Sequence, residues 1–145
     1  ILSQPFFDDL RTKNQLGYLV KMGMNNFRDS YYIIQKIQSD KSIEIIEEKI
    51  KQFNSNIKKI ILECDFSKFV ETLRNQLNEP DYSLDEKIER YQPEIALRSY
   101  LFNRNQILLE QLNKLSINDL TEFVELFLNS KNRIKVIDIG TAKDL

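Results

Sequence analysis

The spacing of apolar residues along the chain changes period more than once, and these changes divide the sequence into helical and extended stretches. Near the start, Phe6, Phe7 and Leu10 are spaced as one face of a helix. We therefore expect a helix over residues 5–16, ended by Gly17 in a left-handed conformation.

The next stretch, residues 18–38, follows the twofold alternation of β-strands. Its first half has large apolar or aromatic side chains at every second position: Tyr18, Val20, Met22 and Met24. Residues 31–38 (YYIIQKIQ) are rich in β-branched and aromatic side chains, and Asn25–Ser30 has the composition of a turn. The pattern predicts two antiparallel strands joined by a polar loop over Asn25–Ser30.

Helical spacing then returns and continues in several segments to near the end of the chain. The first segment has apolar residues three or four positions apart: Ile43, Ile46, Ile50, Phe53, Ile57 and Ile60. Asp65 is a suitable N-cap for the second segment, which Pro80 ends. Ser83 and Glu86 have the spacing of a capping box at the start of the third, in which Pro93 predicts a kink or a break.

The last segments complete an α+β pattern. Two more helices follow, the second beginning at Ser116, and the apolar run Ile134–Ile139 predicts a third strand. This order indicates helices packed on one face of a small antiparallel sheet. Because three strands are few for so many helices, we expect residues 1–145 to form a single partial domain, with more of the sheet preceding Ile1.

The composition limits the chemistry that this chain performs by itself. Of its 145 residues, none is a histidine and one, Cys64, is a cysteine. Catalytic zinc sites and general acid–base catalysis draw mainly on histidine, so this chain can build neither a zinc site nor a Ser-His or Cys-His pair. We expect Cys64 to be a buried structural thiol, which is compatible with a reducing compartment.

The sequence argues against nucleic acid, a membrane and a metal ion as partners of this chain. The formal net charge of −1 lacks the surplus of Lys and Arg that nucleic-acid binding requires. No apolar stretch approaches the ~20 residues of a membrane helix, and no signal-peptide pattern opens the chain. Glu44, Glu47 and Glu48 cluster on one helix, where a solvated face that pairs with Lys51 explains them better than a metal site.

The segment from Pro5 to Val20 (PFFDDLRTKNQLGYLV) concentrates polar side chains beyond what packing requires. Arg11, Lys13, Gln15 and Tyr18 gather around the predicted helix end and strand start. Arg11 and Tyr18 are seven positions apart, two turns of a continued helix, which would place them on the same side. A guanidinium and a phenol held together suit a peptide carbonyl or an oxyanion. The residues alone favour a structural pairing over this functional one.

The same segment resembles the signature of a known family. FFDDLRTKNQLGYLV is similar to F-x-x-L-R-T-x-x-Q-L-G-Y-x-V in the C-terminal half of insulin-degrading enzymes, the insulysin/pitrilysin group of zinc metallopeptidases. YYIIQKIQSDK resembles the strand that follows in the family. The family's spacing of helices is kept through Asn78, Leu84, Tyr91, Phe102–Arg104 and Leu128. The resemblance covers essentially the whole chain, and the first motif is its specific part.

The resemblance implies the C-terminal, non-zinc domain of a zinc metalloendopeptidase that degrades or processes peptides. In the family, two halves of the enzyme close around a chamber, and each half consists of two related α+β domains. An H-x-x-E-H motif far upstream holds the zinc. Tyr18 would donate to the oxyanion that develops on the scissile carbonyl, Arg11 would hold a substrate carbonyl, and Phe7 would line the pocket. A donor on a separate domain would act only after closure, which excludes water and limits substrate size.

These roles also imply the cofactor, the partners and the location. Zinc would be bound outside this chain in the full-length enzyme, so that the chain alone would bind no cofactor and be inactive. Its partners would be the upstream catalytic domains of the same polypeptide and peptide substrates, and an uncovered sheet edge would favour self-association. The resemblance fits a cytoplasmic peptidase. The alternative is a catalytically inactive helical interaction domain of a related pseudo-enzyme, which the absence of an upstream H-x-x-E-H motif would indicate.

Overall fold

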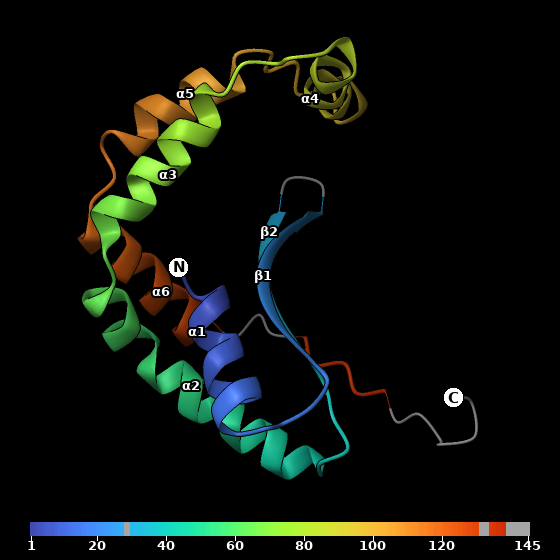
Figure 1. Ribbon diagram of the computed structural model, residues 1–145, viewed down its shortest axis with the longest axis vertical. Coiled ribbons are helices and arrows are strands. Elements are labelled where there is room, and N and C mark those ends of the chain that lie inside the picture. Colours follow the sequence, from blue (N-terminus) through green and yellow to red (C-terminus); the bar gives the residue numbers. More distant parts are fainter. Residues whose placement is uncertain (28–29, 131–133, 139–145) are drawn as a thin grey trace.

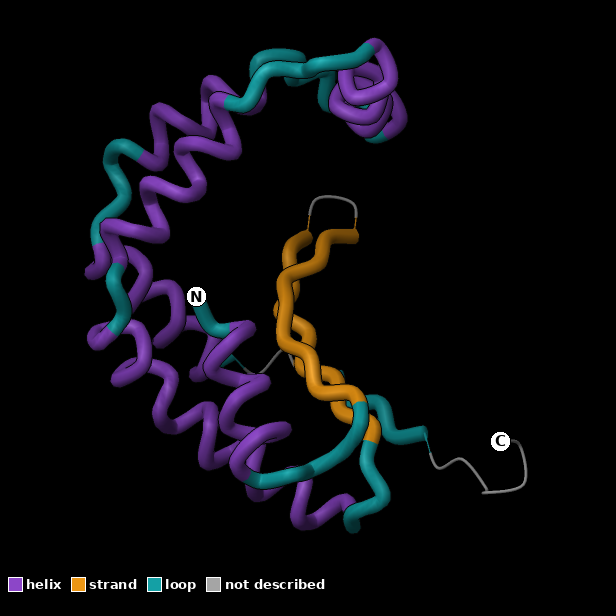
Figure 2. Tube along the Cα trace, in the orientation of Figure 1, coloured by secondary structure: helices purple, strands orange, loops and turns teal. Residues whose placement is uncertain are grey.

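The computed structural model describes residues 1–27, 30–130 and 134–138 (Figures 1 and 2). In these residues a short helix and a β-hairpin precede five longer helices. The elements are α1 (Ser3–Phe7), a π-helical stretch η1 (Asp8–Lys13), β1 (Leu19–Phe27), β2 (Ser30–Gln38), α2 (Ile43–Glu63), α3 (Phe66–Asn78), α4 (Leu84–Ala96), α5 (Arg104–Leu112) and α6 (Ile117–Asn129).

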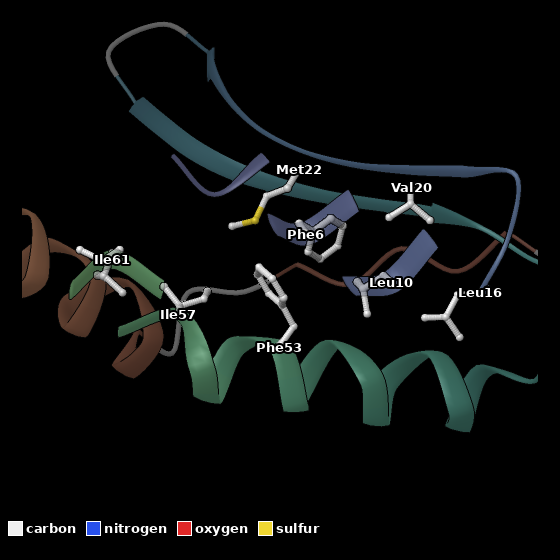
Figure 3. Close-up of a cluster of buried hydrophobic side chains, with 9 residues drawn as sticks. Phe6, Leu10, Leu16, Val20, Met22, Phe53, Ile57 and Ile61 are labelled. Atoms are coloured by element: carbon white, nitrogen blue, oxygen red, sulfur yellow. The ribbon is translucent and has the colours of Figure 1, made fainter. Parts of the chain in front are cut away.

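The helices form a curved row, and the hairpin lies on its inner side (Figure 1). Helix α1 packs against β1, α6 against α2, and α5 against α3. Figure 3 shows α1 between the hairpin and α2, so that one face of the sheet is covered by helix. The predicted α+β fold, with helices on one face of a small antiparallel sheet, is confirmed, and the described residues form a sheet of two strands.

The core lies where the hairpin, α1, α2 and α6 meet (Figure 3). Its buried members are Phe6, Leu10, Leu16, Val20, Met22, Phe53, Ile57, Ile61 and Val124. The rings of Phe6 and Phe53 meet edge to face, with centroids 5.0 Å apart and an interplanar angle of 85°. Removing these side chains from water is the main force that holds the first helical segment against α2.

The hairpin is longer than the alternation predicted. The register runs without interruption from Leu19 opposite Gln38 to Phe27 opposite Ser30. The polar loop expected over Asn25–Ser30 is therefore largely wrong, because cross-strand pairing keeps this polar stretch extended. Residues 28 and 29 lie outside the described part of the chain.

The single helix expected over residues 5–16 is also wrong. The α-helical part spans five residues, a π-helical stretch continues it to Lys13, and Asn14 donates its backbone N–H to the carbonyl of Asp9 at 3.0 Å. The left-handed residue that follows is Gln15, with φ of 48°, and not Gly17. The left-handed backbone of Gln15 ends the helical conformation two residues before Gly17, where the sequence predicts the end.

Two N-cap side chains, by contrast, form the hydrogen bonds that their sequence predicts. Asp65 accepts a hydrogen bond from the N–H of Lys68 at 3.1 Å, and Ser83 accepts one from the N–H of Glu86 at 3.2 Å. The carboxylate of Glu86, however, accepts from the N–H of Tyr82 rather than from that of Ser83. These side chains satisfy N–H groups that have no partner within the helix.

Three further expectations need correction. Pro93 does not end α4, which continues to Ala96, because one missing N–H bond close to a helix end is tolerated. Cys64 is half-buried at the end of α2 rather than buried among helix side chains. Residues 134–138 are irregular where a third strand was expected over Ile134–Ile139, whose last residue lies outside the described range. An apolar run without a neighbouring strand gains no ladder hydrogen bonds.

Candidate functional site

Arg11, Gly17 and Tyr18 meet where the π-helical stretch gives way to β1. Nη1 of Arg11 donates a hydrogen bond to the carbonyl of Gly17. The guanidinium carbon of Arg11 lies 5.8 Å from the centroid of the Tyr18 ring, within the range of a cation–π contact. The structure therefore brings Arg11 and Tyr18 together, although a turn rather than a continued helix joins them.

Buried leucines fix both sides of this turn. Leu10 is fully buried beneath the π-helical stretch, and Leu16 is 2% exposed just before Gly17 (Figure 3). The N–H of Leu16 donates to the carbonyl of Leu10 at 2.9 Å, which closes the turn between them. The N–H of Tyr18 then donates to the carbonyl of Gln38 at 3.1 Å, which ties the site to the end of β2. The backbone under Arg11 and Tyr18 is thus held at both ends.

The side chain of Tyr18 is open to solvent, with 85% of its surface exposed. Within the described residues its hydroxyl makes no hydrogen bond, and its ring contacts Arg11. A phenol in this state keeps its O–H donor free for a ligand. The hydroxyl of Tyr18 is therefore neither buried in the core nor bonded to another described residue.

Phe7 lies on the same helical segment as Arg11, four residues earlier, and is 39% exposed. Its neighbour Phe6 takes the buried position against Phe53, so Phe7 is left on the outer side of the segment. Residues four apart on a helical segment share a side, which places Phe7 and Arg11 next to each other. Lys13 and Gln15 are exposed and do not join the Arg11–Tyr18 contact.

A second charged centre, at the connection between α4 and α5, was missed by sequence reasoning. The carboxylate of Glu94 accepts hydrogen bonds from Nε and Nη2 of Arg104, from Oγ of Ser99 at 2.5 Å and from the N–H of Leu101 at 3.2 Å. These bonds, first that of Arg104 and then that of Ser99, lower the pKa of Glu94 from 4.5 to about 2. Glu94 therefore stays ionised far below neutral pH.

This centre adjoins a hollow of about 700 Å³ between α4, α5 and the hairpin. Tyr91 and Phe102, which help to line it, meet edge to face with centroids 5.5 Å apart. Tyr31 of β2 lines the same hollow. The only signal in the sequence was Arg104 within the F-N-R triplet, and nothing there identified its partner ten residues earlier.

The residues that the structure describes do not fit a zinc site. The sequence has no histidine, and in the described ranges no three His, Cys, Asp or Glu side chains gather so as to hold a metal ion. Of the acidic cluster on α2, Glu47 pairs with Lys135, and Glu48 accepts from Gln52 at 2.9 Å rather than from the predicted Lys51. None of the helices within the described ranges has the length and apolar content to cross a bilayer.

Comparison with known proteins places the chain in a family. Residues 1–92 match the family described as PQQ synthase PqqF-like, C-terminal lobe domain 4, and the chain belongs to this family. It is 29% identical over 140 residues to the A-factor-processing enzyme of Saccharomyces cerevisiae and 30% identical over 141 residues to the insulin-degrading enzyme of Bos taurus. Each alignment covers 94% of this chain and 14% of the relative.

The fold also matches that of a solved structure. The crystal structure of pitrilysin superposes with a TM-score of 0.71 at 20% identity, over 86% of this chain and 14% of that chain. The resemblance to C-terminal domains of the insulin-degrading-enzyme family is thereby confirmed. The chain spans about 14% of the length of the two curated relatives described above.

Proposed function

We propose that this chain is the C-terminal region of a zinc metalloendopeptidase, in which it clamps peptide substrates and stabilises the oxyanion of the reaction. One observation carries the proposal: the exposed phenol of Tyr18 has an unused donor and stands on a backbone fixed at both ends. Residues 1–145 would form part of one domain of the longer polypeptide. Zinc would be held by residues outside this chain, since the sequence has no histidine and the described residues form no cluster that fits the metal.

Tyr18 would donate its O–H to the scissile carbonyl as negative charge develops on the oxygen. A preplaced donor binds the transition state more strongly than the ground state, because the oxygen is more negative in the former. The exposure of Tyr18 means that a second domain must close over it before water is excluded. Closure would then strengthen the hydrogen bond by lowering the local dielectric constant.

Arg11 would hold a substrate carbonyl next to Tyr18. A guanidinium has five N–H donors, and one of those of Arg11 is engaged by the carbonyl of Gly17. The remaining donors are available to a peptide backbone, and the bond to Gly17 fixes the plane from which they extend. Phe7, on the same side of the helical segment, would supply an apolar wall for the substrate side chain beside the scissile bond.

The test is Tyr18→Phe in the full-length polypeptide, assayed on a fluorogenic peptide. The change keeps the ring and its contact with Arg11 and removes only the donor. We expect kcat to fall about 10²–10³-fold with little change in KM, the usual cost of losing one oxyanion donor. Tyr82→Phe is the matched control, because Tyr82 is 76% exposed and lies near the start of α4. Near-wild-type kcat in Tyr18→Phe would contradict the assigned role.

The same assay separates the proposal from the alternative of an inactive interaction domain. An intact polypeptide of that kind would show no chelator-sensitive cleavage before any substitution is made. The isolated chain of residues 1–145 is expected to be inactive under either reading, so the decisive measurement is made on the longer polypeptide.

A further inference from the structure

Gly17 makes an unusually close backbone approach directly beside the Arg11–Tyr18 contact. A Cβ atom placed on Gly17 would lie 1.9 Å from the carbonyl oxygen of Gln38, 2.8 Å from its carbonyl carbon and 2.9 Å from Cα of Ser39. All three are backbone atoms, so no side-chain rotation can relieve the overlap. No described glycine has a positive φ, so glycine is needed at this position for space and not for a left-handed conformation.

Two hydrogen bonds of the site and one buried side chain depend on the position of the Gly17 backbone. The carbonyl of Gly17 accepts the hydrogen bond from Arg11, and the next residue, Tyr18, donates its N–H to Gln38 at 3.1 Å. The preceding residue, Leu16, is anchored in the core. A displacement of Gly17 away from Gln38 would therefore move the acceptor of Arg11 and the backbone of Tyr18 together.

We propose that Gly17 is a positioning residue for the reaction, which sets the place of Tyr18 and Arg11 through its contact with the end of β2. The inference rests on the proposed function of these two side chains. Gly17 itself touches no substrate. Because Gly17 has no side chain, the backbone just before β1 can lie against the carbonyl of Gln38. This contact determines the positions of the Tyr18 phenol and the Arg11 guanidinium.

The hairpin supplies a matched control. Gly23 lies on β1 opposite Ile34, and a Cβ atom at Gly23 would meet nothing within 4 Å. Gly23→Ala therefore adds the same methyl group six residues along the chain without a clash. A general effect of replacing glycine by alanine on backbone flexibility would appear in both variants, whereas a positional effect would appear in Gly17→Ala alone.

The experiment compares Gly17→Ala with Gly23→Ala in the full-length polypeptide, by kinetics and by hydrogen exchange of the backbone amide of Tyr18. The overlap requires a local shift of roughly 1 Å, and such a shift of a catalytic group can reduce the rate about 100-fold. We expect Gly17→Ala to lower kcat by about that factor and to speed exchange at Tyr18. Gly23→Ala should leave both unchanged. Equal effects of the two variants, or an unchanged kcat in Gly17→Ala, would overturn the proposal.

A double-variant cycle separates positioning from a general structural role. If Gly17 acts through Tyr18, Gly17→Ala should cost much less in a Tyr18→Phe background than in the wild type. Equal costs in both backgrounds would overturn the inference. If Tyr18→Phe alone retains kcat, the proposed function fails, whereas faster exchange in Gly17→Ala would still show the positional effect.

Arg11→Met provides a second route if Gly17→Ala does not fold. This variant keeps the aliphatic stem of the side chain and removes the donor to the Gly17 carbonyl. Exchange at the Tyr18 amide should then become faster than in the wild type. Unchanged exchange would show that the carbonyl of Gly17 does not couple Arg11 to the backbone of Tyr18, and would overturn the proposal that Gly17 sets the two side chains together.

Discussion

The Glu94 centre and the Tyr18 site are both built at the ends of helical segments, but their own chain satisfies them to different degrees. Glu94 is 5% exposed, and its carboxylate receives hydrogen bonds from Arg104, Ser99 and Leu101. Tyr18 is 85% exposed, and within the described residues its hydroxyl has no partner. One polar group is enclosed by donors from its own chain, and the other is left with a donor to give.

The difference separates a structural centre from a site that is open to a ligand. A buried carboxylate with all its bonds made fixes the connection between two helices and has little capacity left for binding. An exposed phenol on a fixed backbone contributes little to folding and keeps its donor available. Charge alone would have indicated Glu94 and Arg104 as the functional pair, and hydrogen-bond satisfaction reverses that choice.

The largest expected effect on folding is that of Glu94→Gln. The amide keeps the shape of the side chain, but its NH2 group faces the donors of Arg104 and Ser99, so acceptors are lost where several donors are partly buried. The melting temperature should fall clearly. Glu110→Gln, at an exposed position of α5, is the control and should change it little. Similar melting temperatures for the two variants would show that the hydrogen bonds of Glu94 do not stabilise the fold more than an exposed carboxylate does.

The pH dependence of stability should distinguish the same centre. The pKa of Glu94 is depressed in the folded state, from 4.5 to about 2, so the unfolded chain takes up the proton first as the pH falls. Its contribution is therefore present above about pH 4.5 and is lost as the pH falls towards 2. Urea unfolding should show that the free energies of unfolding of the wild type and of Glu94→Gln converge as the pH falls across this range. A constant difference between them would show that ionisation of Glu94 does not stabilise the fold.

The smallest effect on stability is expected for Arg11→Ala. The change removes a cation–π contact and one hydrogen bond at a half-exposed position, a loss of about 1 kcal/mol in the free energy of unfolding. In the full-length polypeptide it should raise KM as well as lower kcat, because a carbonyl clamp acts before and during the reaction. Lys13→Ala, two residues along, is the control for lost positive charge. Loss of activity in both variants would point to charge rather than to a clamp.

The features that the sequence predicted well are local ones. The N-caps at Asp65 and Ser83 depend on residues three positions apart, and both side chains form the predicted cap, although Glu86 does not complete the box at Ser83. The hairpin follows from a twofold alternation that continues over consecutive residues. Signals of this kind need no knowledge of the rest of the chain, which is why they can be read directly.

The missed features depend on contacts that no local pattern encodes. Glu94 and Arg104 meet because Arg98 and Tyr100 take left-handed backbone angles, which neither residue type favours. Gly17 was interpreted as a helix terminator, but its constraint comes from Gln38, 21 positions away. A continued helix predicts the proximity of Arg11 and Tyr18, but the proximity arises instead from the turn that follows the π-helical stretch.

The π-helical stretch Asp8–Lys13 affects how chains of this family can be aligned. A π-helical segment holds an extra residue relative to an α-helical one, so deleting a single residue within Asp8–Lys13 would restore ordinary helical pitch and rotate the side chain at position 11 around the axis. We therefore expect a change in the length of this segment to disturb the site more than a change in its composition. A one-residue gap at this point in an alignment would mark a relative whose arginine no longer faces its tyrosine, even where both letters are kept.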